Sequence, residues 1–304
     1  MSTSKPQAYL NGDLVPAEAA FVRVDDVGFV WGATVAERMR TFGGRLFRVE
    51  EHLARLGRSL EILGISPPES PDELALRAEQ LAAHNHPLLD AGDDLNLVVF
   101  ITPGPRATAG RKVRPTVCLH TAPLEFGQWA DKYTAGVQLV TTSVRQVPAD
   151  CWPAELKCRS RVHYYLADRE ANADEPGAAA LLLDHDGNVT ESSIANLLMW
   201  REGEGLISPP LETILPGITL AAVAELAARY NIPFQYRPLA ADDLVRADEL
   251  ILASTPYCLL PVTRLNGWPV GNGTPGHTYL RLLQGFSELV GVDIEQQALA
   301  LAGR

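Results

Sequence analysis

A stretch of weak hydrophobic periodicity, from Pro123 to Tyr133, separates two parts of this chain that each contain their own apolar strands and helices. The 304 residues, of which 46% are hydrophobic and 21% charged, suffice for two medium-sized domains with a core each. We therefore expect a domain of residues 1–126 and a larger one of residues 127–304. Strands and helices are mixed without regular alternation or internal repeat, so the pattern predicts the α+β class.

Local signals define the elements of the first part. Tyr9 to Val15 predicts a hairpin around an Asn-Gly turn. A helix carries Leu53, Leu56, Leu60 and Leu63 on one face and ends at Gly64, and Ser70-Pro71-Asp72-Glu73 begins another that runs to about His84. Apolar strands are expected at 95–102 and 115–122, with a loop at 102–110 between them.

The second part should contain three helices around a set of strands. Strands are expected at 136–143, 179–184, 189–200 and 249–254, with a turn at Asp186-Gly187 and a hairpin at 265–268. Helices are expected at about 160–173, 217–230 and 277–290. The weakly periodic stretch 123–133 is the expected linker between the domains.

Charge and cysteine content limit the partners and the compartment. The formal net charge of -11 disfavours nucleic acid or an anionic membrane as the main partner. The cysteines are scattered and form no C-x-x-C pair, which argues against a zinc or redox site and for reduced thiols: Cys118, Cys151, Cys158 and Cys258. The first twenty residues lack the apolar run of a signal peptide, and no stretch could span a bilayer. We expect a cytoplasmic protein without a metal site.

Three chemical features follow one another in the second part: Lys157, Glu191, and an apparent helix start at Leu215-Pro216-Gly217-Ile218-Thr219. A lysine amine can form a Schiff base with an aldehyde when it is unprotonated, and nearby Arg159 and Arg161 could favour that form. A helix start binds anions through its free N–H groups. A lysine, a carboxylate and such a helix start are the groups that pyridoxal phosphate needs. Each residue taken alone could equally be a solvated surface residue.

The order and spacing of these residues resemble the class IV aminotransferases, which are the fold type IV pyridoxal-phosphate enzymes. The family includes branched-chain aminotransferases, D-amino-acid aminotransferases and aminodeoxychorismate lyase, and the resemblance extends from about Tyr9 to about Leu283. It implies a small N-terminal α/β domain, a larger C-terminal domain with a β-barrel-like core, and a homodimer. The cofactor implied is pyridoxal 5'-phosphate.

The resemblance also implies roles for individual residues. Lys157 would form the Schiff base and would move the proton between the substrate α-carbon and the cofactor, and Glu191 would pair with the pyridine nitrogen. Ser193 and Asn196 match the surroundings of the cofactor. The phosphate would be bound by the backbone N–H groups of Ile218 and Thr219, the Thr219 hydroxyl, Thr255 and Arg55.

The substrate pocket departs from the family pattern. Ala36 occupies a position where branched-chain and D-amino-acid enzymes carry Phe or Tyr, so the pocket is wider or is filled by Tyr164, Tyr165 or Trp31. Arg40 follows the branched-chain pattern, although it could instead form a buried ion pair with Glu37. Arg106, in the 102–110 loop, is the candidate for binding a substrate carboxylate, with a solvated loop arginine as the alternative.

The expected activity is transfer of an amino group from a branched-chain-like or D-amino acid to an α-keto acid such as 2-oxoglutarate. One alternative is a lyase that eliminates pyruvate from aminodeoxychorismate on the same cofactor. Another is a cofactor-binding protein without catalytic activity. The spacing from Lys157 to Glu170-Ala171 resembles the D-amino-acid and lyase members more than the branched-chain group, whereas Glu37 and Arg40 follow the branched-chain pattern. The donor's stereochemistry and side chain therefore stay open.

Overall fold

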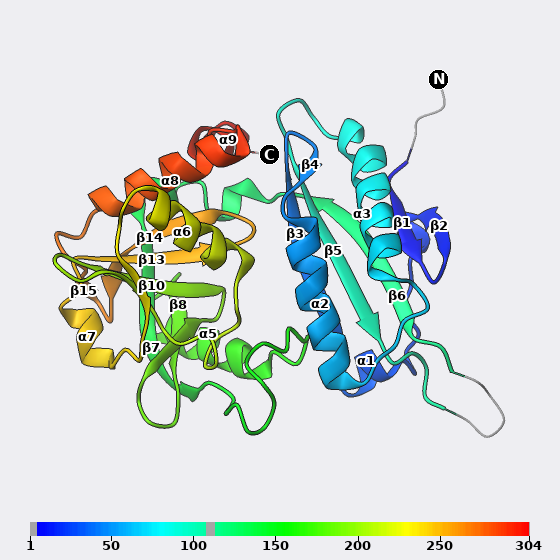
Figure 1. Ribbon diagram of the computed structural model, residues 1–304, viewed down its shortest axis with the longest axis horizontal. Coiled ribbons are helices and arrows are strands. Elements are labelled where there is room, and N and C mark those ends of the chain that lie inside the picture. The colour runs from blue at the N-terminus through cyan, green and yellow to red at the C-terminus, as the bar shows by residue number, and fades with distance from the viewer. Residues whose placement is uncertain (1–4, 108–112, 304) are drawn as a thin grey trace. The chain divides into compact units, whose positions relative to one another are not determined.

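The computed structural model describes residues 5–107 and 113–303, and the chain forms two compact units (Figure 1). Unit 1 contains residues up to Leu124 together with Leu156–Ser160, and unit 2 contains Glu125–Glu155 and the residues from Arg161 onward. The segment Leu156–Ser160 thus differs from the sequence-based division, which placed it in the second domain. Its backbone is hydrogen bonded to residues 34–36 of unit 1, and this pairing explains the difference.

Unit 1 is a six-stranded sheet in the order β2-β1-β6-β5-β3-β4. Neighbouring strands are antiparallel: β1 (Gln7–Leu10), β2 (Asp13–Pro16), β3 (Val35–Phe42), β4 (Arg45–Leu46), β5 (Leu95–Thr102) and β6 (Thr116–Pro123). Its helices are α1 (Val27–Val30), α2 (Val49–Leu63) and α3 (Pro71–Asn85), with short 3-10 turns at Ala17–Ala19 and His86–Leu88. The Asn-Gly hairpin, the Gly64 end of α2 and the Ser70–Glu73 capping box are all confirmed.

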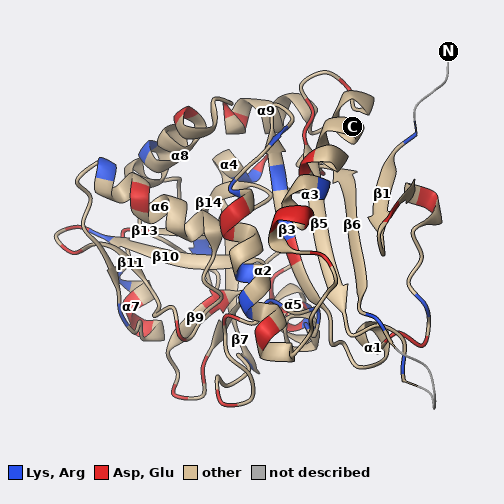
Figure 2. Ribbon diagram, turned by 45° about the vertical axis from the view of Figure 1, so that its right-hand side comes forward, with Lys and Arg blue, Asp and Glu red and all other residues tan. Residues whose placement is uncertain are grey.

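The helices α2 and α3 pack on one face of this sheet (Figure 1). Glu37 of β3 bonds to side chains of α2, so it points to the helix side. Because side chains alternate along a strand, Ala36, Arg38 and Arg40 point to the other face. We call this the open face of unit 1. β3 therefore carries charges of both signs within four residues (Figure 2). Strand alternation directs Glu37 and the two arginines to opposite sides.

Unit 2 is built around a closed ring of strands. In the order β10-β13-β14-β7-β8-β9, each strand pairs with the next and β9 pairs again with β10. The ring strands are β7 (Val137–Arg145), β8 (Ala179–Leu183), β9 (Val189–Ser192), β10 (Ala195–Arg201), β13 (Glu249–Ser254) and β14 (Cys258–Leu265). β11 (Gly205–Ser208) and β12 (Phe234–Tyr236) extend the sheet from β10, and β15 (Trp268–Pro269) pairs with β14. The predicted barrel-like core is confirmed.

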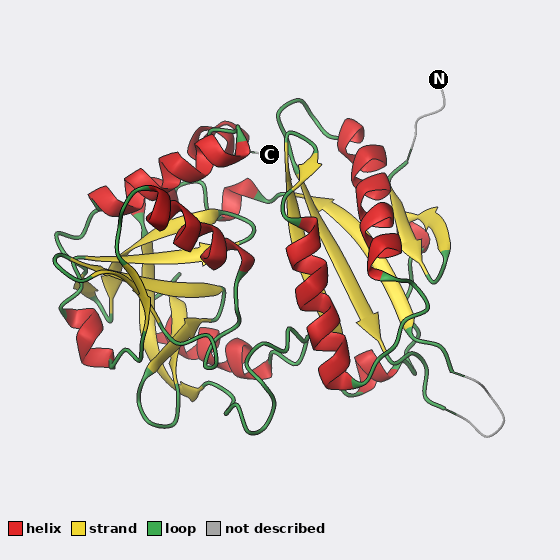
Figure 3. Ribbon diagram, viewed as in Figure 1, coloured by secondary structure: helices red, strands yellow, loops and turns green. Residues whose placement is uncertain are grey.

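Helices cover the outside of this ring (Figure 3). α5 (Val162–Asp174) packs on β7 and β8, while α6 (Ile218–Arg229) and α8 (His277–Val290) pack on β13. The remaining helices are α4 (Lys132–Ala135), α7 (Ala241–Val245), α9 (Ile294–Leu301) and a 3-10 turn at Phe126–Gln128. The core residues Ala167, Ala171, Ala180 and Leu182 show why α5 can lie close to β8: small side chains face the sheet.

One expectation about local structure was wrong. Residues 189–200 form not one strand but the antiparallel pair β9 and β10, which reverses at Ser193-Ile194. The expected linker 123–133 contains the boundary between the two units, between Leu124 and Glu125. After this boundary the segment is packed: Phe126, Trp129 and Tyr133 are buried, and the rings of Phe126 and Trp129 are in edge contact. Aromatic burial holds this segment to unit 2.

Within residues 5–107 and 113–303, no helix has the length and apolar character needed to cross a membrane. The same residues contain no cluster of three or more His, Cys, Asp or Glu side chains suited to a metal ion.

Candidate functional site

Glu191 lies on β9 at the start of the reversal into β10, and its side chain is 7% exposed. The reversal places Glu191 directly opposite Asn196. One carboxylate oxygen accepts hydrogen bonds from the Tyr164 hydroxyl at 2.6 Å and the Gln146 amide at 3.0 Å. The other accepts from the Asn196 amide at 3.2 Å and the Leu215 backbone N–H at 3.3 Å. Donors on both oxygens favour the carboxylate over the carboxylic acid.

Tyr164 and Gln146 are partners of Glu191 that the sequence did not indicate. Gln146 follows β7 and also donates to the Tyr164 hydroxyl oxygen at 2.9 Å. Burial, and then the negative charge of Glu191, raise the pKa of Tyr164 well above its ordinary value, so its hydroxyl stays a donor. Tyr164 was expected only as a possible filler beside Ala36, and its hydroxyl bond to Glu191 was not predicted. The three side chains form one buried hydrogen-bonded group.

The start of α6 lies against the same group. The Asn196 amide, which donates to Glu191, also donates to the Leu215 carbonyl at 2.8 Å. A Cβ atom at Gly217 would overlap the Asn196 Oδ1, so glycine is needed for this close approach. Ile218 and Thr219 are the first two residues of α6, and both are buried. The helix start is thus fixed beside Glu191, where its N–H groups suit an anion.

The turn that contains Thr255 lies at the same end of the ring. It joins β13 to β14, and the Ser254 hydroxyl donates to the Ile194 carbonyl at 2.9 Å. Ser193, in the β9–β10 reversal, donates to Asp168 at 2.5 Å. Unit 2 therefore contains six of the candidate cofactor-binding residues, whereas Lys157, which the sequence-based division also placed in the second domain, lies in unit 1. The six are Glu191, Ser193, Asn196, Ile218, Thr219 and Thr255.

Arg161 lies in unit 2, beside this group. Its guanidinium donates to the Ser193 carbonyl and lies over the Tyr164 ring at 4.4 Å. It therefore supports the β9–β10 reversal. The sequence suggested Arg161 as a cation near Lys157 that could favour the unprotonated amine. In the structure its guanidinium bonds to the Ser193 carbonyl.

Lys157 belongs to unit 1, where its backbone is fixed on both sides. Its carbonyl accepts from the Ala36 N–H at 3.0 Å, and its N–H donates to the Ser59 hydroxyl of α2 at 3.2 Å. An isolated antiparallel bridge joins Cys158 to Val35, so residues 157–159 run beside the first residues of β3. The lysine backbone is held by a strand and a helix of the same unit.

Arg55 forms a buried group with Glu37 and His52 in unit 1. Its guanidinium donates to both Glu37 oxygens, at 2.7 and 2.8 Å, and the His52 Nδ1 lies 2.8 Å from the same carboxylate. Burial alone would raise the pKa of Glu37, but Arg55 and His52 outweigh it and hold the pKa well below its ordinary value. Burial lowers the pKa of His52 more than Glu37 raises it.

The alternative of an ion pair between Glu37 and Arg40 was wrong. The two side chains point to opposite faces of β3, and Glu37 bonds to Arg55 and His52. Arg40 is 1% exposed; it donates to the Thr41 carbonyl at 3.2 Å and lies over the Phe42 ring at 4.1 Å. His52 and Arg55 are three positions apart on one face of α2, a spacing from which the pairing could have been found.

The buried group predicts loss of stability on acidification. The unfolded chain protonates His52 near its ordinary pKa of 6.5, whereas the folded chain does so at lower pH, so unfolding is favoured as the pH falls through that value. Glu37 acts in the same direction below its ordinary 4.5. We expect the urea midpoint to fall between about pH 7 and pH 5, and to fall less in His52→Gln. The control His185→Gln, at an exposed histidine, should lose as much of its urea midpoint over this pH range as the wild type. An equal loss in all three proteins would show that His52 does not cause the pH dependence.

The substrate candidates Ala36 and Arg106 also lie in unit 1. Ala36 is 6% exposed and pairs with Phe100 across the sheet. The Arg106 backbone N–H donates to the Asp25 carbonyl at 3.0 Å, and its guanidinium lies 5.8 Å from the ring centre of Trp31. Trp31 and Tyr165 are 68% and 64% exposed. The expected loop 102–110 extends into residues 108–112, which lie outside the described residues.

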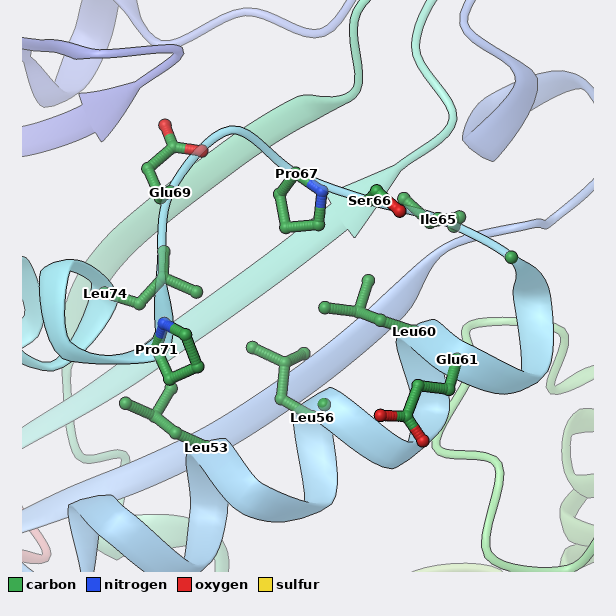
Figure 4. Close-up of a pocket in the computed structure, with 12 residues that line it drawn as sticks. Leu53, Leu56, Leu60, Glu61, Ile65, Ser66, Pro67, Glu69, Pro71 and Leu74 are labelled. Carbon is green, nitrogen blue, oxygen red and sulfur yellow. The ribbon is translucent and has the colours of Figure 1, made fainter.

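A cavity of about 490 Å³ lies elsewhere in unit 1, between α2 and α3 (Figure 4). Leu53, Leu56 and Leu60 of α2 line one side, and Pro67, Pro71 and Leu74 line the other. None of the candidate cofactor or substrate residues contributes to it. The cavity lining is mainly apolar and contains no lysine or arginine that could bind a phosphate or a carboxylate. We therefore do not assign this cavity to the cofactor or the substrate.

Known proteins are similar to this chain over most of its length. The family model described as amino-transferase class IV matches residues 34–265. A protein of Methanocaldococcus jannaschii with the name "Putative branched-chain-amino-acid aminotransferase" is 32% identical, with 92% of this chain and 95% of that protein covered. A D-alanine aminotransferase of Staphylococcus aureus is 30% identical, with 93% and 97% covered. The chain belongs to the class IV aminotransferases.

Solved structures show the same fold. The Escherichia coli branched-chain amino acid aminotransferase has a TM-score of 0.85 at 25% identity, over 94% of this chain and 95% of that one. The T.th. branched-chain amino acid aminotransferase, solved in complex with N-(5'-phosphopyridoxyl)-L-glutamate, has a TM-score of 0.83 at 26% identity, over the same shares. The predicted fold type IV architecture is thereby confirmed.

Class IV aminotransferases use pyridoxal phosphate, and the residues of this chain suit that group. Unit 2 offers a buried carboxylate with donors on both oxygens for a protonated pyridine nitrogen. The same end of unit 2 offers a helix start, packed so closely that Gly217 admits no Cβ atom, for the phosphate. Unit 1 offers an amine and a buried guanidinium. Bound pyridoxal phosphate supplies an electron sink for the carbanion formed when an amino acid loses its α-proton.

Proposed function

We propose that this aminotransferase moves the amino group of a branched-chain-like or D-amino acid to an α-keto acid such as 2-oxoglutarate. The observation that carries the proposal is the Glu191 group, in which a buried carboxylate is oriented by Tyr164, Gln146 and Asn196 next to the start of α6. Such an arrangement suits a pyridine nitrogen and a phosphate on one ligand. The similarity to a D-alanine aminotransferase and to a branched-chain amino acid aminotransferase supports both classes of amino donor.

In this proposal Lys157 would be the residue that holds the cofactor aldehyde as a Schiff base, and its amine would carry the proton to and from the substrate α-carbon. Its backbone bonds to Ala36 and Ser59 restrict the position from which the amine can act. Glu191 keeps the pyridine nitrogen protonated. Arg55, the α6 start with Thr219, and Thr255 bind the phosphate, and Ser193 and Asn196 support Glu191 and its turn. Ala36, Arg40 and Arg106 contact the substrate.

The test is a spectral titration of the pyridoxal-phosphate-loaded protein with single L- and D-amino acids and no acceptor. Loss of the visible cofactor band together with growth of the pyridoxamine phosphate band identifies the donor and its stereochemistry. Release of pyruvate from aminodeoxychorismate without any acceptor would instead assign the lyase activity. A protein that takes up the cofactor and changes with neither class of compound would contradict the proposal.

A homodimer in the cytoplasm is part of the same proposal. Cys118 is a free and buried thiol, and burial raises its pKa to about 11, which keeps it unreactive in a reducing compartment.

Light scattering of the purified holoenzyme tests the homodimer, because it gives the mass of the particle directly. A mass of one chain at micromolar concentration would contradict the dimer.

A further inference from the structure

The cavity between α2 and α3 is bordered by a glycine that the helix itself does not need. Gly57 lines the cavity from the middle of α2, and a Cβ atom on Gly57 would meet no atom within 4 Å beyond its own stretch of the helix. Gly57 is not among the glycines with positive φ. Glycine inside a helix is less favourable than alanine. Because neither a turn nor a close neighbour requires glycine here, its effect is to keep this part of the cavity open.

The residues around Gly57 form an apolar stripe on α2. Leu53, Leu56 and Leu60 lie three or four positions apart and share one side of the helix with Gly57. The connecting segment and the start of α3 form the opposite wall, from Pro67, Pro71 and Leu74 (Figure 4). The volume of about 490 Å³ lies in the range of small-molecule sites. The cavity is therefore suited to the hydrocarbon part of a small molecule.

The charge of the lining is negative. Among the described residues that line the cavity, Glu61 and Glu69 are the only charged ones. Figure 4 shows them at separate ends of the lining, with the leucines of α2 between them. The adjacent start of α3 is already capped by Ser70 and Glu73. A ligand with a carboxylate, such as an amino acid, would have no cation to pair with here, whereas an amine without a carboxylate has the complementary charge.

Glu69 offers a hydrogen-bond acceptor that the fold does not use. Its Oε1 accepts from the Tyr9 hydroxyl at 2.7 Å, and this bond fixes the carboxylate. Burial, and then Glu69, raise the pKa of Tyr9 to about 12, so the hydroxyl stays a donor. The other oxygen of Glu69, Oε2, is buried and has no hydrogen-bond partner among the described residues. Since a buried acceptor without a donor is unfavourable, an N–H group brought to this end of the cavity is favoured.

We propose that the cavity between α2 and α3 binds a small apolar amine, with its hydrocarbon part against the leucines of α2 and its ammonium group donating to Glu69. The inference goes beyond the proposed function and does not depend on it, because no candidate cofactor or substrate residue lines the cavity. Another side of α2 carries Arg55 and Ser59, of which Ser59 accepts from the Lys157 N–H. The two sites therefore share a helix but no side chain.

The test uses the holoenzyme and three ring compounds of similar size. N-methylpiperidine is a cation near neutral pH, cyclohexanol is neutral, and cyclohexanecarboxylate is an anion. N-methylpiperidine is also a tertiary amine, which cannot form a Schiff base with the cofactor. We expect it to bind with a Kd on the order of a millimolar, as suits so small a ligand, and at least about 10-fold more tightly than the carboxylate. In a methyl NMR titration the shifts should be largest for Leu53, Leu56 and Leu60, with Leu282 of α8 unchanged.

The variant Gly57→Leu tests whether the cavity is the binding site. The added side chain occupies the open space beside α2, so N-methylpiperidine should bind at least about 10-fold more weakly. Leucine forms helix more readily than glycine, and a urea midpoint at or above that of the wild type shows that the variant is folded. The matched control is Ala54→Leu, which adds a leucine on the exposed side of α2 and should bind like the wild type.

The variant Glu69→Gln tests the charge. Its amide keeps an oxygen for the Tyr9 hydroxyl but is neutral, so N-methylpiperidine should bind about 10-fold more weakly, the effect of losing one hydrogen bond to a charged group, and cyclohexanol as before. Glu79→Gln, at an exposed residue of α3 outside the lining, is the control. Absence of N-methylpiperidine binding, equal affinity for the cation and the anion, or wild-type affinity for the cation in either Gly57→Leu or Glu69→Gln would overturn the inference.

Discussion

Replacement of Lys157 by alanine should lower the rate of amino transfer at least about 1,000-fold, because one side chain supplies both the covalent bond to the cofactor and the proton carrier. The structure fixes the lysine backbone through Ala36 and Ser59, so the substitution removes the amine without changing these backbone bonds. Borohydride reduction of the wild-type holoenzyme should attach the phosphopyridoxyl group to the peptide that contains Lys157. The measurement is single-turnover transfer together with mass spectrometry of the reduced protein.

The variant Lys157→Arg is the matched comparison for Lys157→Ala, because arginine is a cation that cannot act as a nucleophile. Lys157→Arg keeps the positive charge and the length of the side chain, but a guanidinium does not lose its proton in proteins. We expect Lys157→Arg to be as inactive as Lys157→Ala and to remain unlabelled by borohydride. Lys5→Ala, which removes a lysine with a side chain that is 71% exposed, should have wild-type activity. Labelling at a lysine other than Lys157 would disprove the assignment.

Elements with local signals could be predicted from the sequence. The capping box of α3 and the Gly64 end of α2 depend on contacts within a few residues, and both occur as expected. The reversal between β9 and β10 could not be predicted, since Ser193-Ile194 contains no glycine, proline or asparagine, and serine is a weaker turn signal than these residues. The reversal is stabilised by tertiary contacts instead: the Ser193 hydroxyl to Asp168 and the Arg161 guanidinium to the Ser193 carbonyl.

The difference between local sequence signals and tertiary contacts also explains which parts of the candidate site could be predicted. Lys157 and Glu191 are predicted as site residues because their spacing along the chain resembles a known family. The place of Lys157 in unit 1 depends on pairing with residues 34–36, more than a hundred positions away, for which the local sequence holds no signal. Gln146 and Tyr164 likewise come from separate elements, the end of β7 and α5, and meet only because those elements are neighbours in unit 2. Their role is visible in the fold and not in the sequence.

Glu191→Gln should lower kcat about 100- to 1,000-fold, the effect typical of removing one oriented electrostatic group from an active site. The amide has nearly the shape of the carboxylate but no charge, and it cannot keep a pyridine nitrogen protonated. It also brings an NH₂ group among donors, because Tyr164, Gln146 and Asn196 all donate to Glu191. Steady-state turnover and the affinity for pyridoxal phosphate are the measurements. Glu202→Gln, an exposed residue just after β10, is the control.

Titration of Tyr164 separates this electrostatic role from a general loss of folding. The Glu191 charge is, after burial, the second cause of the raised pKa of Tyr164. Removing the charge should therefore lower that pKa in Glu191→Gln, so that one tyrosine ionises at lower pH than in the wild type. The ultraviolet difference between the wild type and Glu191→Gln on alkaline titration should disappear when Tyr164→Phe is added to both. Wild-type turnover in Glu191→Gln with an unchanged tyrosine titration would show that the carboxylate has no part in the chemistry, because both consequences follow from the same buried charge.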